Sequence, residues 1–173
     1  HIVYYYLTNH VLMYARWTGS AWITQAVDSV DRVGGYTSLA LDASGHPHIS
    51  YWGDDNLKYA HWTGSTWLTQ TVDGAPHAGE YASLALDVNG YAHISYYVKY
   101  PSYDLRYARW TGSAWITETV DSAGEVGEHT SLALDANGYP HISYHDYTNG
   151  DLKYARWTGS VWVTQTVDRG GTV

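Results

Sequence analysis

Aromatic, acidic and amide side chains gather in four short stretches of the sequence, which read YYLTNHV, YWGDDN, YYVKYPSYD and YHDYTNGD. An aromatic ring can stack on the C–H face of a sugar, while carboxylate and amide oxygens accept hydrogen bonds from its hydroxyls. The stretches therefore predict a ligand-binding surface. Its candidate residues are Trp52, Asp54, Asp55, Tyr97, Tyr100, Tyr103, Asp104, His145, Asp146, Tyr147, Asn149 and Asp151. The alternative is that these are solvated loops whose polar residues close turns.

The stretch DYTNGD, from Asp146 to Asp151, also has the oxygen donors that a hard cation takes from one loop. It lacks the twelve-residue pattern of the best-known calcium loop, and TNG is itself a turn signal. We therefore predict no metal and no cofactor, with calcium as the alternative.

Catalytic motifs are missing from the sequence: it has no Gly-x-Ser-x-Gly elbow, no His-Glu-x-x-His and no phosphate loop. Asp54, Asp104 and Asp146 would have to approach one another to form the acid pair of a glycosidase. No acid pair confined to one unit is visible, so we predict no catalytic residues and no enzyme.

Four histidines recur at one position of a repeated unit, namely His1, His48, His93 and His141. A ring of metal ligands is one interpretation of this pattern. Equivalent atoms of neighbouring units should lie too far apart for one ion with ligands at about 2 Å. We expect instead a structural hydrogen bond that recurs because the unit recurs.

The repeat itself is marked by the tripeptide WTG at Trp17, Trp62, Trp110 and Trp157, with spacings of 45, 48 and 47 residues. A period in the forties indicates stacked units rather than one irregular core. No segment has a helical period over three turns, which excludes a helical solenoid. A β-sandwich remains an alternative, although a sandwich does not need near-identical units.

Two hairpins are predicted in each unit. SLALD and HISY are joined by an Asp-x-x-Gly turn, in which Asp42 would bond the turn backbone. Gly19 and Ser20 are the central pair expected of a two-residue type II′ turn. That turn sets Trp17 opposite Trp22, and counting back along the strands sets Tyr14 opposite Gln25 and Leu12 opposite Val27.

Neither face of the second hairpin is polar enough to lie in water, as in a sheet packed between two neighbours. The sequence therefore predicts an all-β protein, a β-propeller of about four four-stranded antiparallel blades within a single domain, 1–173. The expected blades are 1–28, 37–73, 82–121 and 130–168. The first would lack its innermost strand and have an unpaired edge. We expect further repeats or a second chain to supply that strand, and a chain that starts on His1 suggests a piece of a longer protein.

The unit SLALDANGYPHISYHD, followed by DLKYARWTGS, resembles repeats of secreted and surface proteins of bacteria and archaea that form β-propellers. Its first hairpin is also similar to those of NHL-type and Asp-box blades. The Asp-box pattern Ser-x-Asp-x-Gly-x-Thr-Trp is not matched, since Gly45 lies three residues after Asp42. The resemblance implies the fold and an extracellular or cell-surface location, but no single function.

Charge and composition exclude two classes of partner. The formal net charge is -8 with only 9 Lys and Arg, whereas nucleic acid requires a basic face. The sequence has no run of about 18 apolar residues, the length needed to span a membrane. The absence of cysteine leaves the redox compartment open.

Comparison of the four copies locates the expected recognition surface. The Asp-x-x-Gly and Gly-Ser turns hardly change between copies, whereas the other connections vary and lie at the opposite end of the strands. Variable loops on a rigid scaffold are where binding is usually built. We predict a non-enzymatic extracellular binding or scaffolding module for a carbohydrate or a protein surface. The alternatives are a structural repeat of a larger surface protein or filament and a glycan-acting propeller enzyme.

Overall fold

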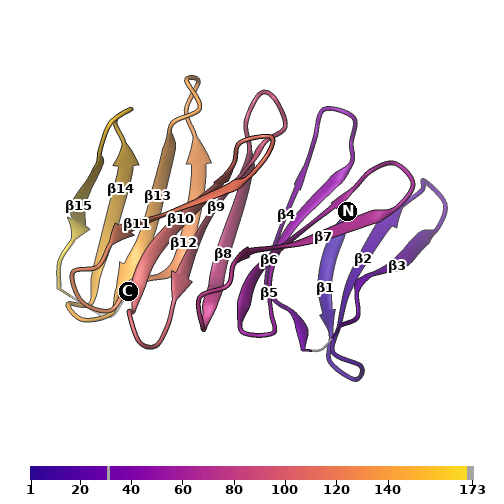
Figure 1. Ribbon diagram of the computed structural model, residues 1–173, viewed down its shortest axis with the longest axis horizontal. Coiled ribbons are helices and arrows are strands. Elements are labelled where there is room, and N and C mark those ends of the chain that lie inside the picture. The colour runs from indigo at the N-terminus through magenta and orange to yellow at the C-terminus, as the bar shows by residue number, and fades with distance from the viewer. Residues whose placement is uncertain (31, 171–173) are drawn as a thin grey trace.

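The computed structural model describes residues 1–30 and 32–170, and within them it contains fifteen strands in four antiparallel sheets. The sheets stand side by side as blades 1 to 4 (Figure 1). Blade 1 has three strands, so the prediction that it lacks the innermost strand is confirmed. The strands of blades 1 and 2 are β1 (Ile2–Tyr6), β2 (Val11–Trp17), β3 (Trp22–Asp28), β4 (Val33–Leu41), β5 (Pro47–Gly53), β6 (Asn56–Trp62) and β7 (Trp67–Asp73). Those of blades 3 and 4 are β8 (Ala78–Leu86), β9 (Ala92–Val98), β10 (Asp104–Trp110), β11 (Trp115–Asp121), β12 (Val126–Leu134), β13 (Pro140–Asp146), β14 (Asp151–Trp157) and β15 (Trp162–Asp168).

The inner strands β4, β8 and β12 begin earlier than the predicted blades. In blade 2 the strand starts at Val33, whereas the expected blade began at residue 37. Register shifts between Val33 and Ser38 break the alternation of side chains, and Tyr36 has a positive φ of 47°. The segment therefore lacks the period of two by which a strand is recognised.

The Gly-Ser hairpin has the predicted register. Trp17 pairs with Trp22, Tyr14 pairs with Gln25, and the backbone N–H of Thr18 donates to the carbonyl of Ala21 at 2.9 Å. In all four blades the two tryptophan rings lie in contact, with centroids 5.5–5.6 Å apart. The first hairpin is also confirmed, because Oδ1 of Asp42 accepts the backbone N–H groups of Ser44 and His46 at 2.8 Å.

One predicted pair is wrong: Leu12 lies opposite Asp28 rather than Val27. The register shifts between Leu12 and Met13, so Val27 is the extra residue of a β-bulge. As a result, Val27 and Asp28 are neighbours in sequence yet both are buried. The Asp28 carboxylate accepts a hydrogen bond from the Tyr51 hydroxyl of blade 2 at 2.7 Å, which gives the bulge a role in joining blades.

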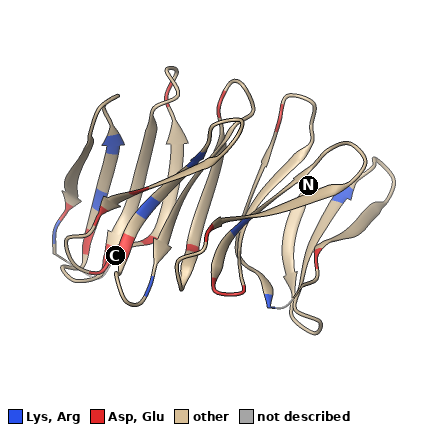
Figure 2. Cartoon of the chain, viewed as in Figure 1, with Lys and Arg blue, Asp and Glu red and all other residues tan. Residues whose placement is uncertain are grey.

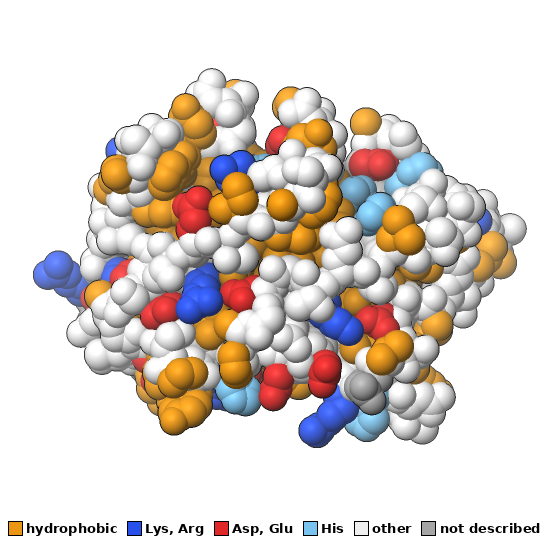
Figure 3. Space-filling model, in the orientation of Figure 1, with side chains coloured by type: hydrophobic (Ala, Val, Ile, Leu, Met, Phe, Trp, Pro, Cys, Tyr) orange, Lys and Arg blue, Asp and Glu red, His pale blue; other side chains and the backbone are white. Residues whose placement is uncertain are grey.

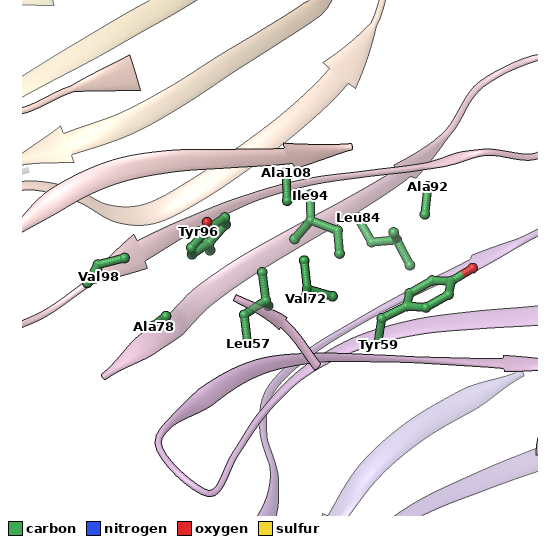
Figure 4. Packing of buried hydrophobic residues seen from close by; sticks show 10 residues of the cluster. All are labelled: Leu57, Tyr59, Val72, Ala78, Leu84, Ala92, Ile94, Tyr96, Val98 and Ala108. Carbon is green, nitrogen blue, oxygen red and sulfur yellow. The ribbon is translucent and has the colours of Figure 1, made fainter. Parts of the chain in front are cut away.

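Each blade has two apolar faces. We call the face that carries the paired tryptophans the front and the face that carries Tyr14 and Gln25, in blade 1, the back. The back of each blade packs against the front of the next. Figure 4 shows the contact of blades 2 and 3, where Leu57, Tyr59 and Val72 meet Ile94 and Tyr96. Equivalent residues form the other two contacts.

The two ends of the blades differ as expected. The Asp-x-x-Gly and Gly-Ser turns lie together at one end, here called the fixed-turn end, which is uppermost in Figure 1. The connections β1–β2, β5–β6, β9–β10 and β13–β14 lie at the other, variable-loop end. Blades 1 and 4 stand at opposite ends of the row (Figure 1).

In the view of Figure 2, basic residues lie singly among acidic ones. No helix capable of crossing a membrane is found in the part of the chain that the structure describes.

Candidate functional site

Two cavities lined by equivalent positions of the repeat open between neighbouring blades at the fixed-turn end. The first, of about 270 Å³, lies between blades 1 and 2 and is lined by Tyr14, Arg16 and Gln25 on one side and by His46 and Trp62 on the other. Figure 3 shows hydrophobic side chains in the hollows between the upper turns. Ligand pockets commonly measure about 300–1,000 Å³, so this cavity lies just below that range and has room only for a small ligand.

The second cavity, of about 320 Å³, lies between blades 3 and 4. Tyr107, Arg109 and Glu118 form its first side, and Tyr139 and Trp157 are part of its second. Each of the nine positions that line the first cavity has its repeat counterpart in the second. The repeated unit therefore builds the same site twice.

Strand pairing explains why these side chains converge. Tyr14 and Gln25 are cross-strand partners, so both point to the back of blade 1. Arg16 lies two residues beyond Tyr14 and therefore shares that face. Trp62 ends β6 on the front of blade 2 and packs against Trp67, with centroids 5.5 Å apart. Strands thus hold the blade 1 wall of the cavity, and the opposite wall combines Trp62 at the end of β6 with the turn residue His46.

A tryptophan of the following blade fixes the polar group in each site. The indole Nε1 of Trp67 donates to Oε1 of Gln25 at 3.2 Å, and its ring meets the edge of Tyr14 at 5.3 Å and 71°. In the second site, Nε1 of Trp162 donates to Oε2 of Glu118 at 3.1 Å. One oxygen of each side chain is thereby committed, and the remaining amide or carboxylate atoms can face a ligand.

The charges in the second site suit a neutral, hydroxyl-rich ligand. Arg109 supplies N–H donors and Glu118 supplies acceptors within one small aromatic cavity. Burial raises the pKa of Tyr107 above its ordinary value, so its hydroxyl stays protonated. Burial likewise lowers the pKa of His93, whose Nδ1 is hydrogen-bonded to the Tyr107 hydroxyl. The tyrosine and the histidine are therefore neutral near pH 7.

Between blades 2 and 3 the repeat changes this chemistry. His61 stands at the arginine position, and its ring stacks on His48 and on Tyr59 at 5.7 Å. Burial lowers the pKa of His61 below its ordinary value. This position therefore lacks the permanent cation of the other two sites.

The predicted binding residues lie at the variable-loop end, and their contacts are made mainly within single loops. The rings of Tyr100 and Tyr103 meet edge to face at 6.3 Å, as do those of His145 and Tyr147 at 6.1 Å. Asp54 and Asp55 form the tight β5–β6 turn, with φ of 51° and 62°. Trp52 is half-buried beside Gly35, and the Tyr97 hydroxyl donates to Glu125 at 2.9 Å. Asp151 pairs with Asp146 across the β13–β14 turn.

Asp104 and Asp146, two of the predicted ligand carboxylates, are buried in the fold. Asp104 lies 3.8 Å from Arg106, and Asp146 accepts the backbone N–H and the side-chain Nδ2 of Asn149 at 3.0 and 2.9 Å. The Asp146 contacts match the turn-closing alternative, whereas Asp104 is paired with Arg106 along β10. Ligand binding by the other loop residues stays a prediction. No group of three or more His, Asp or Glu positioned to hold a metal ion is found among residues 1–30 and 32–170.

A row of aromatic rings on the inner strands was not predicted. The centroids of Tyr36 and Tyr81 are 4.9 Å apart, and those of Tyr81 and His129 are 4.4 Å apart. All three residues have a positive φ, which is unusual for such side chains. Burial and the nearby Glu80 carboxylate raise the pKa of Tyr36 to about 12. The signal was present in the sequence, where GYT, EYA and EHT precede each SLAL.

The expected structural hydrogen bond of the repeated histidines is confirmed. His1, His48, His93 and His141 each bond through Nδ1 to a tyrosine hydroxyl of the adjacent strand in the same blade.

Solved structures share this architecture. A fucose lectin from Kordia zhangzhouensis, in complex with methyl-fucoside, superposes with a TM-score of 0.55 and 22% identity over 78% of this chain and 99% of that one. The six-bladed β-propeller lectin of Aleuria aurantia, with its fucose recognition, gives a TM-score of 0.58 and 16% identity over 92% of this chain and 54% of that one. A polysaccharide lyase, an ulvan lyase, gives a TM-score of 0.58 and 16% identity over 92% and 49%.

Apart from the Kordia lectin, this chain spans about half the length of these proteins. No family model matches the sequence, and neither does any curated protein. The structural likeness and the four antiparallel sheets together establish that the chain has the β-propeller fold, of the kind used by these lectins.

Proposed function

We propose that the chain is a non-enzymatic carbohydrate-binding module that holds a small neutral sugar in the cavities between its blades. The observation that carries this proposal is the recurrence of one lining, an arginine, a Gln or Glu, a tyrosine and a tryptophan, in two separate cavities. The aromatic walls suit the C–H face of a sugar, and the arginine and the amide or carboxylate suit its hydroxyls. The fucoside complex among the structural neighbours supports a deoxyhexose as the first sugar to test.

The variable loops are the other surface open to a ligand. We favour the cavities because their arginine, their tyrosine and their Gln or Glu stand on strands, whereas two of the loop carboxylates are already occupied within the fold. The resemblance to secreted repeat proteins supports an extracellular location for this activity.

Calorimetric titration of the full chain with α-methyl-L-fucoside, and with a panel of other monosaccharides, tests the proposal. The variant carrying Arg16→Ala and Arg109→Ala should bind at least about tenfold more weakly, since a hydrogen bond to a charged group contributes about 1.5–3 kcal/mol. The matched control is Tyr147→Ala, which removes an exposed loop ring and should leave affinity unchanged. Loss of binding in the control alone would assign the site to the variable loops.

A glycan-acting enzyme is the second candidate, because a polysaccharide lyase is among the structural neighbours. A lyase releases an unsaturated sugar that absorbs ultraviolet light. We expect no such product from the wild-type chain with sulfated or uronate-containing polysaccharides, and enzyme-dependent absorbance would favour this candidate instead.

A further inference from the structure

The front of blade 1 and the back of blade 4 are the two halves of a contact that the chain makes three times internally. Each internal contact contains the same two hydrogen bonds. In the contact between blades 2 and 3, Nε1 of Trp115 donates to Oε1 of Gln70 at 2.9 Å, and the Tyr96 hydroxyl donates to Asp73 at 2.7 Å. The ring of Trp115 also meets the edge of Tyr59 at 5.1 Å.

Blade 1 presents the front half of this contact to solvent. Trp22, the counterpart of Trp115, is 52% exposed. Ile2 is 47% exposed, whereas its counterparts in the other blades, such as Ile94, are fully buried. Tyr4 occupies the position of Tyr96. An apolar face of this kind on a folded domain commonly marks an interaction surface.

Blade 4 presents the back half. Val167 is 60% exposed, whereas Val72, its counterpart in blade 2, is 8% exposed. Gln165 and Asp168 stand at the positions of Gln70 and Asp73, and both are exposed. The residues needed to receive a front face are therefore all present.

We propose that the front of blade 1 binds the back of blade 4 of a second copy of this chain. In that contact Trp22 donates to Gln165 and packs on Tyr154, while the Tyr4 hydroxyl donates to Asp168. A second copy is the occupant because it carries the matching residues at the matching positions.

The contact between copies lacks one ion pair. Lys58, Arg106 and Lys153 each bind the aspartate of the preceding blade, with N–O distances from 2.5 to 3.4 Å. The equivalent residue of blade 1 is Met13. We therefore expect association to be weaker than the internal contacts and to depend on protein concentration. The contact joins two different surfaces, so it extends head to tail into a ring or a chain of copies.

Sedimentation of the full chain, together with three single substitutions to aspartate, tests the proposal. The wild-type mass should rise above 19.4 kDa as concentration increases. Trp22→Asp destroys the front face and Val167→Asp destroys the back face, so each variant alone should stay monomeric. Both side chains are exposed, and circular dichroism checks that each variant folds. Val88→Asp, in a turn outside both faces and 96% exposed, is the control and should associate like the wild type.

An equimolar mixture of the Trp22→Asp and Val167→Asp variants gives the decisive result. Each variant keeps the face that the other has lost, so the mixture should form a pair of chains and grow no further. A wild type that stays monomeric at high concentration would overturn the proposal. So would a mixture that stays monomeric while the wild type associates, or variants that associate as the wild type does.

Discussion

The indole Nε1 of Trp67 in blade 2 donates a hydrogen bond to Oε1 of Gln25 in blade 1, at 3.2 Å. The same bond joins Trp115 to Gln70, and Trp162 to Glu118. The outer tryptophan of each pair thus connects neighbouring blades and also fixes the amide or carboxylate that lines the cavity. Blade packing and the proposed binding site therefore depend on one contact.

Removing this bond should lower stability. In Trp115→Phe an aromatic ring remains, but Oε1 of Gln70 loses its donor in a partly buried contact. A lost bond of this kind lowers the free energy of unfolding by about 1–3 kcal/mol. Urea denaturation measures the change. Trp22→Phe, at the same position of blade 1, is the matched control: at protein concentrations low enough to keep the chain monomeric, it should change stability by less than about 0.5 kcal/mol. Equal losses in the two variants would contradict the role of the bond.

Mild acid should destabilise the fold through its buried histidines. Burial lowers the pKa of His93 below its ordinary value, so the folded chain resists a proton that the unfolded chain accepts. The neutral His93 side chain therefore contributes fully to stability above about pH 6.5, the pKa of histidine in the unfolded chain. This contribution is lost as the pH falls below that value. Unfolding free energies at pH 7.5 and 5.5 measure this loss. His93→Gln should reduce the difference between the two pH values, and an unchanged difference would contradict the assignment.

Gly79 should tolerate no side chain. Its φ is 103°, and a Cβ there would lie 2.8 Å from the Cα of Leu57 in the preceding blade. Because backbone atoms cannot move aside cheaply, Gly79→Ala should unfold at a much lower urea concentration than the wild type. Gly90→Ala is the control: its φ is 80° but no atom lies within 4 Å, so it should lose only about 1 kcal/mol. Similar losses in the two variants would contradict a steric origin.

Local turn chemistry explains what could be predicted from the sequence. Gly19 and Ser20 define a two-residue turn, which determines that Trp17 faces Trp22 whatever surrounds the hairpin. The bulge at Val27 could not be found in this way. It brings Asp28 to the hydroxyl of Tyr51, which belongs to the next blade and lies 23 residues further along the chain.

The cavities escaped prediction for a different reason. Arg16 and Trp62 belong to different blades and meet only when the blades pack, and both lie in segments that repeat almost unchanged. The differences between copies mark only the variable loops. The available signal was a polar pair, Arg16 and Gln25, on a face that otherwise carries core residues.

A crystal structure of the chain soaked with α-methyl-L-fucoside tests the central claim most directly, since it locates the sugar. We expect the sugar between blades at the fixed-turn end, with its ring against Trp62 or Trp157 and its hydroxyls bonded to Arg16 or Arg109. Sugar bound only at the variable-loop end, beside Tyr100 or Tyr147, would contradict the claim.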